Sequence, residues 1–138
     1  MKDAINKMSN ALVCKPRARI VAHARNSLAP EDFTLAPIGA AEQVLAKAGW
    51  SASDVDLWEI NEAFAMVTML TTRALDLDPA CVNVHGGACA QGHPIGSTGS
   101  RIIVTLIHAL EHYGKQRGVA ALCIGGGEAT AVAIELVS

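Results

Sequence analysis

The chain alternates between short apolar runs typical of strands and longer segments with helical spacing, and this alternation limits its possible folds more than any other feature. Segments 18–24 and 55–60 have the composition of buried strands, and two further strand-like runs, 118–124 and 130–137, follow one another closely. Helical segments lie between the earlier strands. The order favours an α/β layered fold with a mixed sheet, because the last two strands are too close for a crossover helix.

Three segments are predicted to be helical. Residues 37–48 begin with a proline at the first helical position and are followed by a glycine. Residues 61–75 begin with Asn61, which can cap a helix. Their apolar side would consist of Phe64, Val67 and Leu70. Residues 99–113 are apolar nearly all round, which predicts a buried helix, and Gly114 suits the left-handed position after its end.

Length and composition narrow the class of protein. At 138 residues the chain is the size of one domain, and with 51% hydrophobic and 17% charged residues it can form a core. A formal charge of −2 gives no electrostatic reason to bind nucleic acid or an anionic membrane. No apolar run approaches the ~20 residues of a membrane helix, and no signal peptide follows Met1. We therefore expect a soluble protein in the cytoplasm.

Two glycine-rich stretches hold the groups with the clearest chemical potential. GGACAQGHPIGSTGSR (86–101) contains His93, and CIGGGEATA (123–131) contains Cys123. An imidazole suits proton transfer near neutral pH, and a thiol beside an imidazole can serve as an acid, a base or a nucleophile. Glycines let the backbone approach a ligand and point N–H groups at developing negative charge. Asn61 also follows a strand, so the three side chains could converge where strands end.

Other interpretations of these residues remain open. His93 and Cys123 could be a turn histidine and a buried cysteine with no catalytic role, since a free cysteine is usually a small buried hydrophobe. Four metal-type ligands fall at every fourth position, although glycines and Pro94 interrupt any continuous helix there. The glycine-rich loops lack the lysine of a P-loop and the dinucleotide fingerprint. The spaced ligands are Cys81, His85, Cys89 and His93.

Three blocks together resemble the active-site blocks in the C-terminal half of thiolases. These are NEAFA (61–65), GGACAQGHPIGSTGSR and CIGGGEATA, in the family's order, with Asn61 and His93 separated by 32 residues and His93 and Cys123 by 30. The resemblance is greatest to the acetyl-CoA C-acetyltransferase type. It makes residues 16–138 a thiolase C-terminal domain, whereas residues 1–15 match poorly.

The resemblance implies Claisen condensation and thiolysis between acetyl-CoA and acetoacetyl-CoA, with coenzyme A thioesters as substrates and no further cofactor or metal. It implies that His93 activates an acyl-carrying cysteine and later polarises a thioester oxygen. Cys123 would be the acid–base thiol at the acetyl α-carbon. Asn61 would hold a water in the oxyanion hole for the enolate, and the backbone N–H of Gly125 would serve a second oxyanion hole. It also implies a homo-oligomer.

The sequence departs from the family in three respects. It has no counterpart to the N-terminal half that carries the acyl-accepting nucleophile, and the spare thiols Cys14 and Cys89 lack that nucleophile's setting. Gln91 replaces the usual leucine and would put an amide near His93. Residues 1–14 do not resemble the strand expected there, so the family's layered domain, with helices on both faces of its sheet, could lack one strand.

These departures leave several hypotheses open. The chain could be the catalytic half of an acyltransferase that needs a separate N-terminal half. It could instead be a non-catalytic remnant or assembly module, or a regulator that binds coenzyme A.

Overall fold

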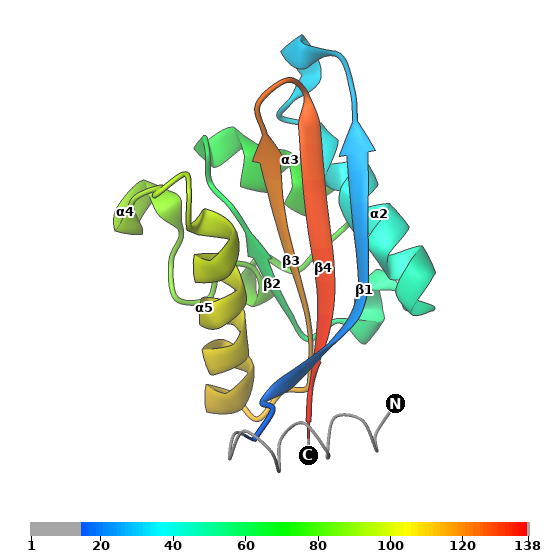
Figure 1. The fold of residues 1–138 in the computed structure, drawn as a ribbon, viewed down its shortest axis with the longest axis vertical. Helices are drawn as coiled ribbons and strands as arrows, with labels where there is room; N and C mark the ends of the chain where they lie inside the picture. The colour runs from blue at the N-terminus through cyan, green and yellow to red at the C-terminus, as the bar shows by residue number, and fades with distance from the viewer. Residues whose placement is uncertain (1–14, 138) are drawn as a thin grey trace.

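A computed structural model describes residues 15–137, and its elements follow the predicted order of strands and helices (Figure 1). The sheet contains four strands in the order β1-β4-β3-β2. Three short 3-10 turns lie between the longer elements, at Pro30–Asp32, Ala52–Asp54 and Pro79–Cys81. The longer elements are β1 (Ala18–Ser27), α2 (Ala36–Ala48), β2 (Leu57–Ile60), α3 (Ala65–Ala74), α4 (Ala88–Gln91), α5 (Thr98–His112), β3 (Arg117–Ile124) and β4 (Glu128–Leu136).

The sheet is mixed, as predicted. β2 pairs in parallel with β3, whereas β3 with β4 and β4 with β1 are antiparallel. The tight connection between β3 and β4 explains their antiparallel pairing, because a parallel pair needs a long crossover. The described residues form four strands plus an isolated parallel bridge from Trp58 to Val82 beyond β2, and the segment in which the sequence suggested a missing strand, residues 1–14, lies outside them.

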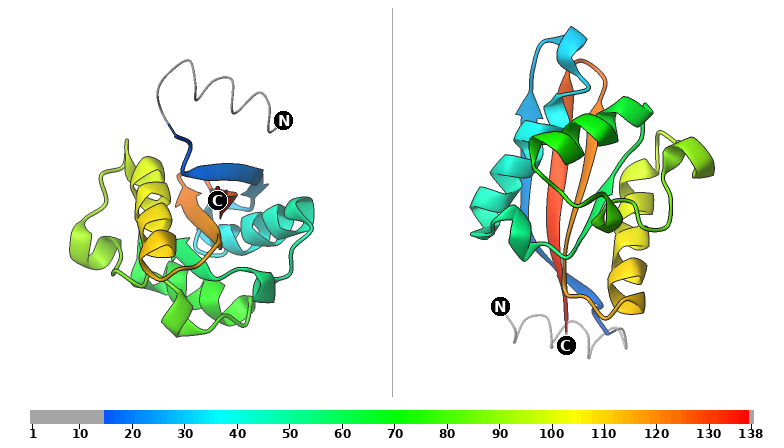
Figure 2. Two further views of the ribbon diagram at one scale, coloured as in Figure 1. Left: turned by 90° about the horizontal axis from the view of Figure 1, so that it is seen from below. Right: turned by 180° about the vertical axis from the view of Figure 1, so that it is seen from behind.

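Helices cover both faces of the sheet, which confirms the predicted layers. Seen along the sheet from below, α2 and α5 lie on opposite sides (Figure 2). The cluster under α2 includes Val44, Ile60 and Val119, and the cluster under α5 includes Ile102 and Leu106. Alternate residues of the strands supply the two clusters, because successive side chains of a strand point to opposite faces. The sheet is therefore covered on both sides, and the middle of β3 is apolar and mostly buried.

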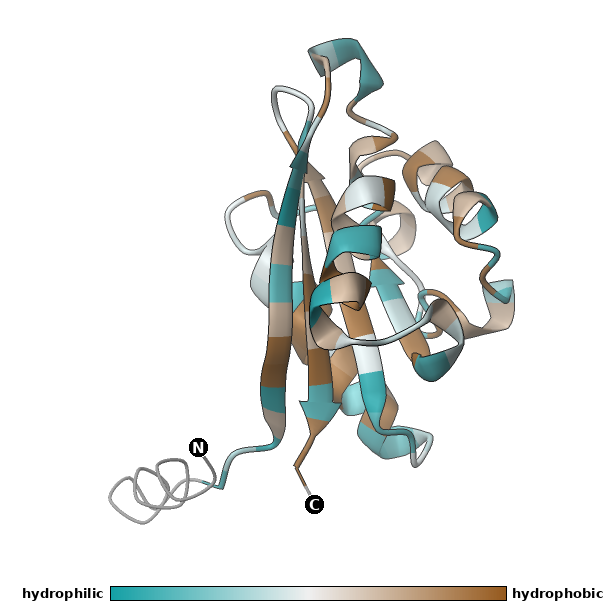
Figure 3. Ribbon diagram, turned by 90° about the vertical axis from the view of Figure 1, so that its right-hand side faces the viewer, coloured by the Kyte–Doolittle hydropathy of each residue, from teal (hydrophilic) through white to brown (hydrophobic). Residues whose placement is uncertain are grey.

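β1 is an edge strand and has the more alternating pattern that an edge allows. Its colours change along its length between hydrophobic and hydrophilic (Figure 3). Ala24 is buried in the α2 cluster, whereas Ile20 is 65% exposed and Arg25 faces solvent. A strand paired on one side only can keep polar residues, since one of its faces or edges meets water.

The predicted beginning of the second helix is wrong. α3 begins at Ala65, its N-cap is Phe64 without a side-chain hydrogen bond, and Asn61 instead continues the sheet by donating its N–H to Ala121 O at 2.9 Å. Phe64 was expected on the buried side but is 59% exposed, in edge-to-face contact with Phe33 at 5.8 Å. The parallel pairing with β3 keeps Asn61 extended, and tertiary hydrogen bonding prevails over its capping preference.

The third helix exists as predicted, but it is not buried all round. One side of α5 is buried through Ile102, Leu106 and Leu110, whereas Val104 is 54% exposed. Only one face of α5 meets the sheet, so Ile103 and Ile107 beside that face are partly buried against its cluster and Val104 is exposed. Gly114 has a φ of +63°, which confirms the predicted left-handed position after the helix.

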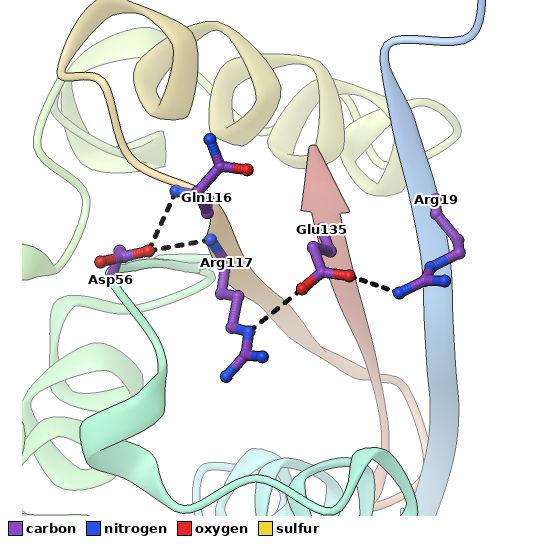
Figure 4. A network of polar contacts seen from close by, with 5 residues as sticks. All are labelled: Arg19, Asp56, Gln116, Arg117 and Glu135. Carbon is purple, nitrogen blue, oxygen red and sulfur yellow. Dashed lines mark hydrogen bonds and ion pairs between the residues drawn. The ribbon is translucent and has the colours of Figure 1, made fainter. Parts of the chain in front are cut away.

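A polar network fastens the end of the sheet where β3 begins (Figure 4). Asp56 accepts hydrogen bonds from the backbone N–H groups of Gln116 and Arg117 at 3.0 and 2.9 Å. Glu135 lies between the guanidinium groups of Arg117 and Arg19 and pairs with both. These contacts align β2, β3, β4 and β1 at one end and leave the opposite end of the sheet for the loops described next.

Candidate active site

A cavity of about 510 Å³ lies at the end of the sheet where β3 ends. Its wall is mainly apolar, but it includes the imidazole of His93, the thiol of Cys123 and the backbone of Gly125. Such a volume suits a small ligand or part of a larger one. Segments from both faces of the sheet meet there. The other lining residues are Pro30, Phe33, Ala63, Ile95, Thr98, Leu122, Ile124 and Gly126.

The sheet register explains why these groups gather. Ile60 of β2 pairs with Ala121 of β3 in parallel, so both strands leave the sheet at the same end. Asn61 follows the first strand, and Cys123 is the penultimate residue of the second. Sites in open α/β sheets form at the carboxyl ends of parallel strands for this reason. Of the three side chains predicted to converge, His93 and Cys123 line one cavity, whereas Asn61 is not among its lining residues.

Asn61 lies beside this cavity rather than on its wall. It is 1% exposed, and Ala63, two residues later in the chain, lines the cavity. Its Oδ1 accepts a hydrogen bond from the Arg101 guanidinium at 3.2 Å, whereas its Nδ2 is buried without a partner among residues 15–137. An unpaired buried donor is costly, at about 1–3 kcal/mol, which indicates that a water or ligand oxygen belongs there.

The tautomer of neutral His93 follows from its hydrogen bonds. Its Nδ1 lies 2.7 Å from the Thr98 hydroxyl, and that hydroxyl donates to the carbonyl of Pro94 at 3.0 Å. Because the single hydroxyl proton is used on Pro94, the hydroxyl oxygen must accept from His93 Nδ1–H. Nε2 then carries the free lone pair and can accept a proton.

Burial sets the resting state of Cys123. The residue is 8% exposed, and loss of solvation raises the pKa of its thiol above the ordinary value, against a smaller opposing effect of a backbone hydrogen bond. The thiol is therefore protonated at neutral pH. In that state it can donate a proton directly, and it can act as a base only after losing one.

The loop after Cys123 needs glycine for close approach. Gly127 has a φ of +82°, and a Cβ there would lie 2.5 Å from the carbonyl oxygen of Leu28. The backbone N–H of Leu28 donates to Gly127 O at 2.9 Å, which ties this loop to the end of β1. Gly125 is exposed and lines the cavity, and no neighbouring atom lies within 4 Å of the position of a Cβ there. Its backbone therefore faces open space that a ligand can occupy.

Glu62 connects the loop after β2 to helix α4. Its carboxylate accepts the backbone N–H of Cys89 at 2.9 Å and the side-chain amide of Asn83 at 3.4 Å. The amide of Asn83 also bonds both backbone groups of Ile60, at 2.8 and 2.9 Å. Together these contacts hold the segment before His93 against the end of β2. Glu62 therefore has a structural role in joining the two segments.

Several sequence-based alternatives can now be assessed. Among residues 15–137 no group of three or more His, Cys, Asp or Glu side chains could hold a metal ion, and the four spaced ligands do not share a helix. Cys89 is exposed on α4, and partial loss of solvation together with the nearby Glu62 carboxylate raises the pKa of its thiol. Cys14 lies outside the described residues. Gln91 contacts Arg101 and the carbonyl of His85, and no hydrogen bond joins it to His93.

Sequence reasoning missed three residues of this region. Thr98 and Arg101 lie within the first glycine-rich stretch, 86–101, but nothing in the sequence distinguishes them from ordinary residues of a helical first turn. Glu59 is 2% exposed, and burial raises the pKa of its carboxyl to about 7 against the attraction of Arg101. The available signal was its position two residues before Asn61, because side chains two residues apart in extended backbone face the same side of the sheet.

Comparisons with known proteins place this cavity in a family. The sequence profile of the thiolase C-terminal domain matches residues 14–136. The chain is 53% identical over 121 residues to the cytosolic acetyl-CoA acetyltransferase of Mus musculus, covering 88% of this chain and 30% of that protein. It is 49% identical over 124 residues to the mitochondrial acetyl-CoA acetyltransferase of Rattus norvegicus, covering 90% of this chain and 29% of that protein.

Solved structures agree with the sequence relatives. The acetyl-CoA acetyltransferase of Bacillus anthracis superposes with a TM-score of 0.90 at 42% identity, covering 95% of this chain and 33% of that one. A thiolase from Ascaris suum, solved in complex with coenzyme A, gives 0.88 at 44% identity, covering 95% and 34%. The chain therefore belongs to the thiolase family, and the matched part is the C-terminal domain. It spans about 30% of the length of its curated relatives.

Proposed function

We propose that this chain supplies the acid–base half of an acetyl-CoA acetyltransferase, which exchanges an acetyl group between acetyl-CoA and acetoacetyl-CoA. The observation that supports this most is the shared cavity of His93, Cys123 and Gly125 in a chain whose relatives are named acetyl-CoA acetyltransferases. The thiol, the imidazole and backbone donors are the groups that deprotonation next to a thioester requires.

In condensation, the nucleophilic cysteine first takes the acetyl group of one acetyl-CoA, and the coenzyme A thiolate that leaves takes the proton of the Cys123 thiol. The resulting Cys123 thiolate then removes a proton from the methyl group of a second acetyl-CoA. The C–H bond breaks, an S–H bond forms, and the electron pair moves to the thioester oxygen as an enolate. A water on Asn61 Nδ2 and a proton on His93 Nε2 would stabilise that oxygen. The enolate carbon then attacks an acetylated cysteine, whose sulfur leaves as a thiolate, and acetoacetyl-CoA results. Gly125 N–H would stabilise the tetrahedral oxyanion of that step.

The hydrogen bonds of His93 suit its two proposed tasks in succession. With Nδ1–H held by Thr98, Nε2 first accepts the proton of the nucleophilic thiol. The same Nε2–H then becomes the donor that polarises the thioester oxygen. One imidazole nitrogen thus serves as base and afterwards as hydrogen-bond donor, because the other nitrogen never leaves its structural partner.

We propose further that the nucleophilic cysteine comes from a segment that this chain does not match. The relatives are about three times as long as the aligned region, and neither Cys89 nor Cys81 lines the cavity. Family membership leads us to propose a homo-oligomer. A cytoplasmic location is supported by cytosolic relatives, although mitochondrial relatives match as well. In the described residues, no helix is long and apolar enough to cross a membrane.

The proposal is tested by combining the chain with a separately expressed N-terminal part of a full-length relative. We expect the chain alone to show no thiolysis of acetoacetyl-CoA and no acetylated cysteine after incubation with acetyl-CoA. The mixture should regain thiolysis, and Cys123→Ala should abolish it, whereas the matched control Cys81→Ala should retain it. Stable association without activity would favour a non-catalytic assembly module. Turnover by the lone chain would contradict the proposal that the nucleophilic cysteine comes from another segment.

A further inference from the structure

The hydrogen bond between Arg101 and Asn61 has only one possible direction. A guanidinium carries donors and no acceptor, so the Asn61 atom that faces it at 3.2 Å must be the carbonyl oxygen Oδ1. The hydrogen bond from Arg101 therefore determines which of the two amide atoms of Asn61 is oxygen and which is nitrogen. The Nδ2 group then points away from Arg101, and it is this group that lacks a partner.

Gln91 holds Arg101 in place from the other side. Its Nε2 donates to the backbone carbonyl of His85 at 2.8 Å, so its Oε1 is left to accept from Arg101 at 3.0 Å. A consistent series of donors and acceptors thus runs from a backbone carbonyl through Gln91 and Arg101 to Asn61. Turning either amide over would place donor against donor, so the series has a single stable arrangement.

Unpartnered buried atoms gather around this series. They are Nδ2 of Asn61, Nε of Arg101 and Oε1 of Glu59, and they are the only such side-chain atoms among residues 15–137. Glu59 and Asn61 are two residues apart in extended backbone and share the sheet face that α5 covers, the face of Leu57. Two donors and one acceptor are what a single buried water satisfies, at about three hydrogen bonds each.

We propose that Arg101, held by Gln91, is a positioning residue that orients the Asn61 carboxamide and leaves its Nδ2–H as the donor to an oxygen beside the cavity. The inference rests on the proposed function for the identity of that oxygen, which would be the water of the oxyanion hole. The orientation itself rests on hydrogen bonds alone. Gln91, on this account, supports Asn61 and does not disturb His93.

The orientation is tested by ¹⁵N NMR on the 138-residue chain. The Asn61 side-chain signals are assigned by their loss in Asn61→Asp. In Arg101→Met we expect them to shift and to exchange with solvent about tenfold faster, because the carboxamide loses the Oδ1 hydrogen bond that holds its orientation and opens to water more often. Gln91→Leu should produce the same change more weakly, because it removes the acceptor that holds Arg101 in place. Arg73→Met, at the exposed end of α3, is the charge-matched control.

A second measurement concerns the reconstituted enzyme. Arg101→Met should lower kcat up to about 100-fold with little change in KM, because a misplaced donor acts mainly in the transition state. Gln91→Leu should lower kcat less than Arg101→Met does, because Gln91 acts on Asn61 only through Arg101. Asn61 signals that stay unchanged in a folded Gln91→Leu and Arg101→Met would overturn the inference. Because the NMR measurement needs no turnover, an inactive mixture would count against the proposed function alone.

Discussion

At the scale of single residues, burial decides what the ionisable groups near the site can do. Cys123 and Glu59 are nearly inaccessible to water, and desolvation favours the neutral form of each, so the pKa of each group rises. Asn61 cannot ionise, and the consequence of its burial is instead that its Nδ2 donor has no hydrogen-bond partner among residues 15–137. The three side chains follow or lie near the ends of adjacent parallel strands, where the sheet stops supplying backbone partners. Of the three, only Cys123 lines the cavity, so Glu59 and Asn61 depend on neighbours such as Arg101.

Glu59 gives a prediction for the pH dependence of stability. Its carboxyl has a pKa of 4.5 when unfolded and about 7 when folded, so the folded state binds the proton more tightly. The stability it supplies is complete below pH 4.5 and is lost as the pH rises through 7, a decrease of about 2–3 kcal/mol. In Glu59→Gln this decrease should disappear. Urea denaturation at pH 5 and pH 8 measures it, and an identical pH dependence in both proteins would contradict the buried carboxylic acid.

At the scale of elements, the short helix α4 is positioned by contacts to the loop after β2. A Cβ at Gly87 would lie 2.4 Å from the Glu62 carboxyl carbon, so backbone and carboxylate are in close contact there. The same carboxylate accepts the N–H of Cys89. Gly87 thus permits the contact with Glu62 that positions α4. Gln91, the last residue of α4, in turn accepts a hydrogen bond from Arg101.

We predict that Gly87→Ala destabilises the chain by about 1–3 kcal/mol, because the new methyl group must displace the Glu62 carboxylate. Gly96→Ala is the matched control, since no atom lies within 4 Å of a Cβ there. Denaturant midpoints compare the two, and the backbone N–H signal of Cys89 should move only in the first. Equal midpoints, or a Cys89 signal that stays in place, would contradict this account of α4.

At the scale of the whole molecule, one four-stranded sheet joins two separate apolar clusters. Val44 of α2 belongs to the cluster on one face, and Leu106 of α5 belongs to the cluster on the other. Both side chains are fully buried. The strands between them contribute to both clusters, so neither face can unfold without exposing the other side of the same strands.

We therefore predict a single cooperative transition in which Val44→Ala and Leu106→Ala both lower the same midpoint. Leu106→Ala should cost about 2–5 kcal/mol and Val44→Ala somewhat less, through lost burial and the cavities left behind. Their effects should add within about 0.5 kcal/mol, because the two sites share no partner. The exposed Val104→Ala is the control and should change little. Two separate transitions in denaturant would show instead that the faces unfold independently.

The sequence by itself determined the order of strands and helices, the antiparallel final hairpin and the left-handed Gly114, and it singled out His93 and Cys123, which line one cavity. These follow from local patterns and from glycine's freedom, which act over a few residues. The extended conformation of Asn61, the one-sided burial of α5, the tautomer of His93 and the series from Gln91 through Arg101 to Asn61 depend on partners 5 to 60 residues away. Only the tertiary structure decided them, because a hydrogen bond between distant residues has no local signature in the chain.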